Sequence, residues 1–249
     1  MLLLVDIGNT STSFGFYKGG RLSKVGYCLT SYFPSIAIQM INNRHTIPIK
    51  SILITSVFPK ITSKIKKLAR RRKHLKIWVV GGNLKVRISH NYNNINELGS
   101  DRLVNAYGAI RLYGPPVLLL DFGTALTCDY LSEKGRFEGG LIIPGPELAL
   151  KTLSEKTALL PKISFPSKYR PFLGRDTRGG MQAGILQGYG AMTDGLVERF
   201  RARFGRKFQV IATGGLAKVI RPYTRHIDRV DPLLTLKSLA RIFQDCLAP

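Results

Sequence analysis

The stretch VLLLDFGTALTCDYL, residues 117–131, repeats a pattern that the chain has already used in LLLVDIGNTSTSFGFY, residues 2–17. When Asp121 is aligned with Asp6, apolar residues precede each Asp, a Gly follows two positions later, and Ser and Thr residues come next. A repeat separated by nearly half of a 249-residue chain favours two duplicated domains over an array of short repeats. The sequence therefore predicts two related domains, each opening with the same apolar strand.

A Gly-Pro-Pro turn at residues 114–116 separates the two copies, so we expect domains at residues 1–115 and 116–249. Strand patterns alternate with helical patterns in both halves, which is typical of α/β folds. Residues 2–17 and 117–131 are predicted as strand hairpins, and residues 139–150 as a strand, a turn and a helix. The other predicted strands cover 51–59, 75–82 and 208–217, and the other predicted helices cover 60–73, 101–114, 199–207 and 235–247.

Composition and targeting signals predict a folded protein of the cytoplasm. The opening MLLLV is too short for a signal peptide and lacks a basic flank, and no apolar run approaches the ~18 residues that a membrane span needs. The three cysteines, Cys28, Cys128 and Cys246, are far apart and show neither a metal-binding spacing nor a disulfide framework. We therefore expect a reducing compartment and no membrane partner.

The chain is strongly basic, with 38 Lys and Arg against 15 Asp and Glu and a formal net charge of +23. The excess is concentrated in SKIKKLARRRKHLK (63–76) and RFRARFGRK (199–207). Two interpretations remain open: a solvated basic face on each helix, or a footprint for nucleic acid or lipid. Because the first segment lacks interleaved aromatic residues, we expect nucleic-acid binding that is at most weak and nonspecific.

Asp6 and Asp121 each follow an apolar strand and precede a Gly, where backbone N–H groups can approach an anion without an intervening side chain. Such a turn suits phosphate, and a carboxylate beside it can hold Mg²⁺ through water. Ser11, Thr12 and Ser13 offer further hydroxyl contacts. The alternative is that each Asp-x-Gly is only a hairpin turn. No P-loop or protein-kinase signature is present, so a nucleotide site here needs another architecture.

Six blocks of sequence together resemble type III pantothenate kinases, and the similarity extends over nearly the whole chain. The blocks are DIGNT (6–10), GSDR (99–102), DFGTALTCDY (121–130), GGLIIPG (139–145), TALLP (157–161) and TGGLA (213–217). The resemblance implies an actin-like ATPase fold, with two duplicated ribonuclease-H-like domains around an ATP cleft. It also implies ATP-dependent phosphorylation of pantothenate to 4′-phosphopantothenate, the first step of coenzyme A biosynthesis.

On that resemblance, Asp101 is the general base that takes the proton from the primary hydroxyl of pantothenate. Local chemistry permits the role, because a carboxylate in the first turn of a helix is held ionised by the helix dipole. Phosphoryl transfer depends mainly on positioning and charge neutralisation, so one base, a metal and fixed phosphate contacts can suffice. The alternative is an ordinary helix start in which Ser100 is the cap.

The resemblance also assigns the residues that bind ATP and cations. Asp121 is the ligand of a monovalent cation (K⁺ or NH₄⁺), and Thr124 contacts ATP. The Mg²⁺ held through water is expected at Asp6 from the carboxylate chemistry given above. Gly214 and Gly215 form the turn on the adenosine side. The first phosphate hairpin comprises Asp6, Ile7, Gly8, Asn9, Thr10, Ser11, Thr12 and Ser13.

The family's pantothenate pocket is completed across a homodimer interface, which implies that this chain is a homodimer. The matching substrate-binding residues are Tyr92, Gly99, Ser100, Asp101, Arg102 and Thr177. Tyr92 could instead be an ordinary surface aromatic, and Thr177 a turn residue. The sequence departs from the family pattern at Ile95-Asn96, where a Pro is missing, and at Asp176, which could place a negative charge near an anionic substrate.

Two other functions deserve comparison with the kinase. A regulatory or nucleic-acid-associated protein on the same fold agrees with the basic charge, but intact Asp6, Asp101 and Asp121 favour the enzyme. A ribonuclease-H-like nuclease needs several clustered carboxylates for two metals, and the Asp-bearing blocks are better explained by ATP.

Overall fold

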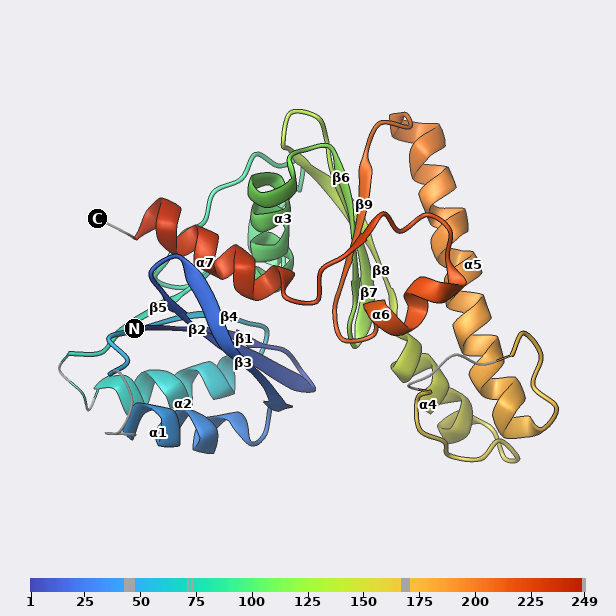
Figure 1. Ribbon diagram of the computed structural model, residues 1–249, viewed down its shortest axis with the longest axis horizontal. Helices are drawn as coiled ribbons and strands as arrows, with labels where there is room; N and C mark the ends of the chain where they lie inside the picture. Colours follow the sequence, from blue (N-terminus) through green and yellow to red (C-terminus); the bar gives the residue numbers. More distant parts are fainter. Residues whose placement is uncertain (43–47, 71, 73, 167–170, 248–249) are drawn as a thin grey trace. The chain divides into compact units, whose positions relative to one another are not determined.

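The computed structural model describes residues 1–42, 48–70, 72, 74–166 and 171–247. Arg71 and Lys73 of the first basic segment lie outside the described residues. The chain forms two compact units, one of residues Met1–Tyr113 and Leu234–Pro249 and the other of residues Gly114–Leu233 (Figure 1).

The first unit is built on a five-stranded sheet with the strand order β3-β2-β1-β4-β5. β1 pairs antiparallel with β2 and parallel with β4, β2 pairs antiparallel with β3, and β4 pairs parallel with β5. The strands are β1 (Leu2–Ile7), β2 (Ser11–Lys18), β3 (Arg21–Leu29), β4 (Ser51–Ser56) and β5 (Lys76–Val79). The predicted hairpin and both later strands of this half are confirmed.

Helices cover both faces of this sheet, as Figure 1 shows. Because side chains alternate along a strand, Leu3 and Val5 of β1 pack with the apolar side chains of α1 and α2, whereas Leu2 and Leu4 pack with those of α3 and α7. The predominantly apolar β1 and β4 thus lie inside a three-layer unit. The helices are α1 (Phe33–Asn42), α2 (Pro59–Arg70), the 3₁₀ turn η1 (Ile95–Glu97), α3 (Ser100–Tyr113) and α7 (Leu234–Cys246).

The second unit repeats the same topology, with the strand order β10-β9-β6-β7-β8. β6 pairs antiparallel with β7 and parallel with β9, as β1 does with β2 and β4. The strands are β6 (Val117–Phe122), β7 (Ala125–Leu131), β8 (Phe137–Pro144), β9 (Gln209–Thr213) and β10 (Arg229–Val230). The helices are α4 (Pro146–Lys156), α5 (Thr177–Phe204), α6 (Ala217–Ile220) and the 3₁₀ turn η2 (Arg221–Tyr223).

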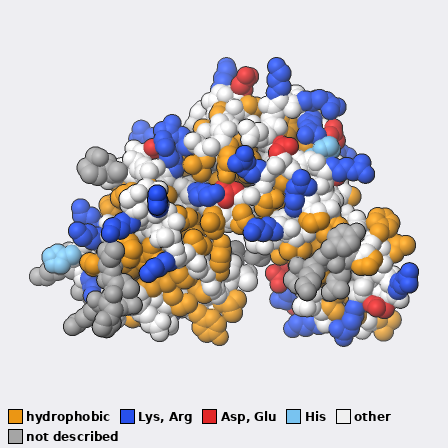
Figure 2. Space-filling view, viewed as in Figure 1, with side chains coloured by type: hydrophobic (Ala, Val, Ile, Leu, Met, Phe, Trp, Pro, Cys, Tyr) orange, Lys and Arg blue, Asp and Glu red, His pale blue; other side chains and the backbone are white. Residues whose placement is uncertain are grey.

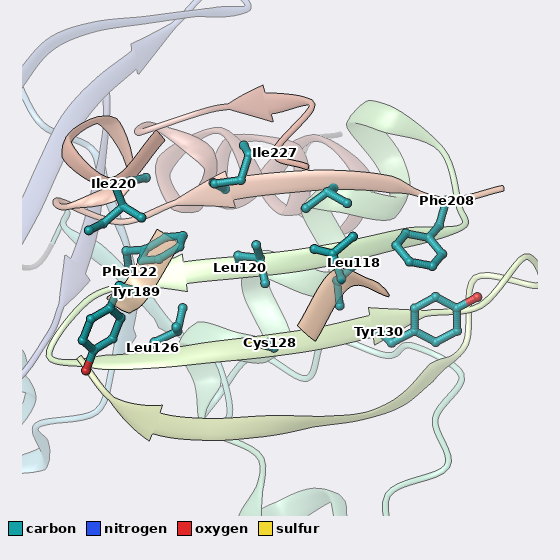
Figure 3. Close-up of a cluster of buried hydrophobic side chains, with 14 of the residues drawn as sticks. Leu118, Leu120, Phe122, Leu126, Cys128, Tyr130, Tyr189, Phe208, Ile220 and Ile227 are labelled. Atoms are coloured by element: carbon teal, nitrogen blue, oxygen red, sulfur yellow. The ribbon is translucent and has the colours of Figure 1, made fainter. Parts of the chain in front are cut away.

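One face of the second sheet carries the largest apolar cluster of this unit. Figure 3 shows Leu118 and Leu120 of β6 beside Leu126, Cys128 and Tyr130 of β7. Side chains of α5 and α6 complete the cluster.

The register confirms the internal repeat. Asp6 lies opposite Ser13 on the antiparallel side and Thr55 on the parallel side. Asp121 lies opposite Thr127 on the antiparallel side and Thr213 on the parallel side. The two Asp residues therefore occupy equivalent places in two ribonuclease-H-like sheets.

The C-terminal helix does not belong to the unit that the sequence suggested. We expected residues 116–249 to form one domain, but α7 packs with the first unit. Its apolar side chains Leu236, Leu239 and Ile242 join the core that lies over β1 and β4. An amphipathic pattern shows that a helix buries one face but not which sheet covers that face.

A close contact and a charged cluster hold α7 against α3. A Cβ placed on Gly108 of α3 would lie only 1.7 Å from Ser238 Oγ of α7, so Gly108 permits the close approach of the two helices. Asp245 accepts hydrogen bonds from Tyr107 Oη at 2.7 Å, Arg111 Nε at 3.1 Å and Arg241 Nε at 3.0 Å. Burial opposes ionisation of Asp245, but these three donors outweigh it and lower the pKa of the carboxyl. Burial and the hydrogen bond to Asp245 raise the pKa of Tyr107 to about 12.

Two long helices of the structure were not expected. α1 was not predicted, and of α5 only the last residues were expected as a helix, whereas it begins at Thr177. Its sequence TRGGMQAGILQGYGAMTDG contains six glycines, which disfavour a helix when judged by propensity alone. Tertiary packing compensates, since a Cβ on Gly190 would lie 2.0 Å from the carbonyl oxygen of Tyr223.

Among the charged side chains on the visible surface, Lys and Arg outnumber Asp and Glu, as Figure 2 shows. On α2 the residues Lys60, Lys64, Lys67 and Arg70 are exposed, while Ile65 is buried. From residue 63 to Arg70, the first basic segment therefore forms an amphipathic helix with a solvated basic face. Within the described ranges, none of the helices combines the length and apolarity that crossing a membrane requires.

Candidate active site

The turn between β1 and β2 is held in one shape by backbone contacts. Gly8 N donates to Ser11 O at 3.0 Å, and a Cβ on Gly8 would lie 2.9 Å from that same oxygen. Thr30, which follows β3, donates from Oγ1 to Gly8 O at 2.8 Å and from its backbone N to Thr10 O at 3.0 Å. This turn contains the residues predicted to bind phosphate, and Thr30 fixes it from outside.

Asp6 lies at the end of β1, beside this turn. Ser13 Oγ lies 3.4 Å from Asp6 Oδ2, a long hydrogen bond across the β1–β2 pair. The donor atoms of these two side chains are all oxygens, which is the chemistry that Mg²⁺ prefers. The residues present therefore fit a magnesium ion held through one carboxylate.

Asp101 lies in the first turn of α3 and reaches the same end of the sheet. Ser100, the first residue of α3, has its Oγ 3.0 Å from Thr55 Oγ1 of β4, and Thr55 is the register partner of Asp6. The alternative interpretation required the Ser100 side chain to cap α3. This side chain is instead hydrogen-bonded to β4. Asp101 Oδ1 accepts from the backbone N of Arg102 at 2.8 Å, and within the described part of the chain no cation forms an ion pair with the carboxylate. Gly99 leaves space for it, because a Cβ there would lie 2.5 Å from Asp101 Oδ1.

Arg102 and Tyr92 are brought together. Arg102 is buried, its Nη1 lies 3.4 Å from Tyr92 Oη, and its guanidinium carbon lies 5.9 Å from the centre of the Tyr92 ring. The structure thus does not show Tyr92 as an isolated surface aromatic. The Arg102 guanidinium thus places a positive charge beside Tyr92 in the first unit.

The second unit gathers Asp121, Thr124 and Gly214 around the end of β6. Gly214 has a φ of +88°, and a Cβ there would lie 2.4 Å from Asp121 Oδ1 and 2.7 Å from Phe122 O. The turn is closed by Gly145 N, which donates to Thr124 O at 2.9 Å. A Cβ on Gly145 would lie 2.2 Å from the carbonyl oxygen of Gly123.

These residues fit a cation better than an anion. The Asp121 carboxylate and the Phe122 carbonyl oxygen face the space that Gly214 leaves by having no side chain. Hard cations take carboxylate and carbonyl oxygens as ligands. Gly215 follows Gly214, and no atom lies within 4 Å of a Cβ built on it. The two glycines, which the sequence could not distinguish, therefore have different surroundings.

Thr177 is the first residue of α5 in the second unit, and it is exposed. Asp176 is the N-cap of this helix, because its Oδ1 accepts from Gly179 N at 2.7 Å. The negative charge that the sequence placed near the substrate is thus engaged with a helix N-terminus, where it is stabilising. The interpretation of Thr177 as a turn residue is wrong.

Three residues that position the site were missed by sequence reasoning: Thr30, Thr55 and Gly145. Thr55 left a signal, since it is a polar residue near the end of the apolar strand SILITS. Thr30 left none, because its partners lie about twenty residues earlier in the chain. Gly145 lay inside a block that resembled the family, but its contact with the Thr124 turn depends on the β7–β8 pairing.

Comparison with known proteins agrees with this geometry. A family model described as type III pantothenate kinase matches residues 2–199. Curated proteins named type III pantothenate kinase from Syntrophus aciditrophicus and Bacillus cytotoxicus are each 35% identical over 252 residues. The alignments cover 98% of this chain and 99% and 96% of the two relatives, respectively.

Solved structures show the same fold at low identity. A Campylobacter jejuni protein described as a Baf family transcriptional activator aligns with a TM-score of 0.61 and 19% identity, over 98% of each chain. Component A of (R)-2-hydroxyglutaryl-CoA dehydratase from Acidaminococcus fermentans aligns with a TM-score of 0.55 and 15% identity, over 96% of this chain and 94% of that one. These similarities concern the fold alone, with its two duplicated ribonuclease-H-like units. The family match and the full-length relatives establish that the chain belongs to the type III pantothenate kinase family.

Proposed function

We propose that the protein transfers the γ-phosphoryl group of ATP to the primary hydroxyl of pantothenate, giving 4′-phosphopantothenate and ADP, the first step of coenzyme A biosynthesis. The observation that carries the proposal is the attachment of the Asp101 helix to the sheet end where Asp6 lies, through Ser100 and Thr55. A base and a phosphate-binding turn are the two parts that phosphoryl transfer needs close together.

Asp101 is the general base. One of its oxygens accepts from Arg102 N, and the carboxylate has no cation partner within the described part of the chain, so a lone pair remains for the substrate proton. As the hydroxyl oxygen of pantothenate bonds to the γ-phosphorus, its proton passes to Asp101. The bond between the γ-phosphorus and the bridging oxygen breaks, and ADP leaves with that electron pair.

Residues of each unit have separate tasks in ATP binding. In the first unit, the turn from Asp6 to Ser13 binds phosphate oxygens, and Asp6 holds Mg²⁺ through water. In the second unit, Thr124 contacts ATP, Gly214 and Gly215 form the adenosine-side turn, and Asp121 binds potassium or ammonium. Bound cations neutralise the charge that develops on the phosphate oxygens.

Pantothenate is an anion, and the buried Arg102 offers a fixed cation for it beside Asp101. Gly99 to Arg102 and Tyr92 form the part of the pocket in the first unit. Thr177 completes the pocket of a partner subunit, so the active form is a homodimer. Light scattering combined with an activity assay tests this point, and an active monomer would contradict it.

The decisive experiment gives the purified protein ATP, Mg²⁺, potassium and pantothenate, and seeks 4′-phosphopantothenate by mass spectrometry. Asp101→Asn should lower kcat by on the order of 10²-fold or more while the circular dichroism spectrum stays unchanged. Glu155→Gln, which changes an exposed carboxylate on α4, is the control and should keep normal activity. A near-normal kcat in Asp101→Asn would remove that residue from the base role.

A further inference from the structure

A chain of hydroxyl groups lies where β4 meets the start of α3. Thr55 Oγ1 donates to Ser100 Oγ at 3.0 Å, and Ser56 N donates to the same oxygen at 3.2 Å. Ser100 Oγ in turn donates to Ser56 O at 3.1 Å. The first residue of α3 is therefore tied to the end of β4 by three hydrogen bonds.

These bonds use the whole capacity of the Ser100 hydroxyl. A serine hydroxyl has one hydrogen to donate and two lone pairs to accept. Ser56 O takes the hydrogen, and Thr55 and Ser56 N supply the two donors. The Ser100 hydroxyl thus has no hydrogen-bonding capacity left for a substrate, so the substrate contact that the family resemblance assigns to Ser100 falls to its backbone.

A second hydroxyl fixes the turn that follows β4. Ser56 Oγ accepts from Phe58 N at 3.0 Å and from Thr62 Oγ1 of α2 at 2.7 Å. Ser56, whose carbonyl oxygen accepts from Ser100, is therefore itself hydrogen-bonded to α2 through its own hydroxyl. Ser100 is tied to a rigid point of the sheet rather than to a mobile loop.

Thr55 connects this chain to the phosphate-binding turn. Its side chain is fully buried, and its register partner in β1 is Asp6. The buried Thr55 hydroxyl thus links β4, the strand beside Asp6, to Ser100, the residue before Asp101. A general base acts only within about 2.6–3.2 Å of its proton, and a misplacement of about 1 Å can cost on the order of 10²-fold in rate.

We propose that Thr55 and Ser100 are positioning residues that set the distance of Asp101 from the phosphate-binding turn. They act through hydrogen bonds to one another and to Ser56, and Ser100 makes no side-chain contact with pantothenate. The inference rests on the proposed function for its kinetic readout.

The test compares Thr55→Val, Thr55→Ser and Ser100→Ala with the wild-type protein. Thr55→Val keeps the shape but removes the donor to Ser100, so kcat should fall roughly 10- to 100-fold. The KM values for ATP and pantothenate should change by less than about threefold, since no substrate contact is lost. Thr55→Ser restores the hydroxyl and should recover most of the activity. Ser100→Ala should resemble Thr55→Val, with a lower kcat and an unchanged KM for pantothenate.

Thr193→Val is the matched control. Thr193 is equally buried, in α5 of the second unit, and its hydroxyl donates to Tyr189 O at 2.7 Å. This variant should keep kcat, which separates positioning from a general effect of burying valine. A kcat of Thr55→Val within twofold of the wild type, or a large rise in the KM for pantothenate in Ser100→Ala, would overturn the inference.

Hydrogen exchange supplies a readout independent of catalysis. The peptide covering residues 98–106 should exchange several-fold faster in Thr55→Val than in the wild type or in Thr193→Val, because α3 has lost its attachment to β4. Unchanged protection in Thr55→Val would refute the positioning role even if the protein phosphorylated nothing. If the wild-type protein lacked pantothenate kinase activity but residues 98–106 exchanged faster in Thr55→Val, only the proposed function would be contradicted.

Discussion

Gly214→Ala should disrupt the proposed cation site at Asp121. The substitution adds two separate free-energy costs, backbone strain and crowding by the new Cβ. Gly214 has a φ of +88°, where a residue with a side chain pays about 1–2 kcal/mol. The new Cβ would lie 2.4 Å from Asp121 Oδ1 and 2.7 Å from the carbonyl carbon and oxygen of Phe122. A carboxylate can swing away, but the Phe122 backbone cannot without breaking the bond from Leu216 N to Phe122 O at 3.2 Å. Crowding of this kind costs about 1–3 kcal/mol.

The expected loss of stability is therefore about 2–5 kcal/mol, together with displacement of Asp121. Gly215→Ala is the matched control, since it adds the same methyl group one residue later with no atom within 4 Å. Its stability should stay within about 0.5 kcal/mol of the wild type. Urea unfolding followed by circular dichroism measures stability, and kinase rates across a potassium titration measure the site. If both variants unfolded at the same urea concentration and responded equally to potassium, the assignment of Gly214 would be wrong.

Three further predictions concern cations, acid and surface charge. Asp121→Asn should abolish the difference between kinase rates in potassium and sodium buffers; equal rates already in the wild type would contradict the cation assignment. Because the pKa of Asp245 is lowered in the folded protein, its stabilising effect is fully present above the ordinary value of 3.8 and is lost as the pH falls through the lowered pKa of the folded state. Asp245→Asn should thus lower stability by about 1–2 kcal/mol at pH 7 and by progressively less as the pH falls below 3.8, as urea unfolding across a pH series can show. Duplex DNA should bind weakly, with an affinity that falls with salt by a log–log slope of about −0.9 per neutralised phosphate and without sequence preference. Changing Lys64, Lys67 and Arg70 together to Gln should weaken that binding and spare kinase activity; a preferred sequence bound ~10³-fold more tightly would show a recognition surface instead.

The parts of the fold that depend on neighbours in sequence were predictable. The apolar runs ending in Asp6 and Asp121 predicted the two hairpins, because strand, turn and strand follow one another directly. The break at Gly114 predicted where the second unit begins. The same logic located Asp101 in the first turn of a helix, since Gly99-Ser100 precedes the helical stretch DRLVNAYGAIRLYG.

The parts that depend on distant contacts were not predictable from one sequence. Thr30 donates to Gly8 in the turn after β1 from across the sheet, and η2 approaches the glycine-rich α5 closely at Gly190. The side on which α7 packs depends on the shape of Gly108 and Ser238 and on the charge of Asp245. These contacts join residues that lie far apart in the sequence and form only when the chain folds. No pattern within a short stretch of sequence predicts them.

The duplicated topology also explains why two equivalent Asp residues can have different tasks. Thr55 and Thr213 are the parallel partners of Asp6 and Asp121, so the next residues, Ser56 and Gly214, occupy equivalent places. In the first unit Ser56 is part of the hydroxyl chain that ties α3 to the sheet, which brings a second carboxylate to the strand end. In the second unit Gly214 has no side chain, and the oxygens of Asp121 and Phe122 face the room it leaves. The same point of the repeat thus holds a serine that binds the start of α3 in one copy and a glycine beside the oxygens of Asp121 and Phe122 in the other.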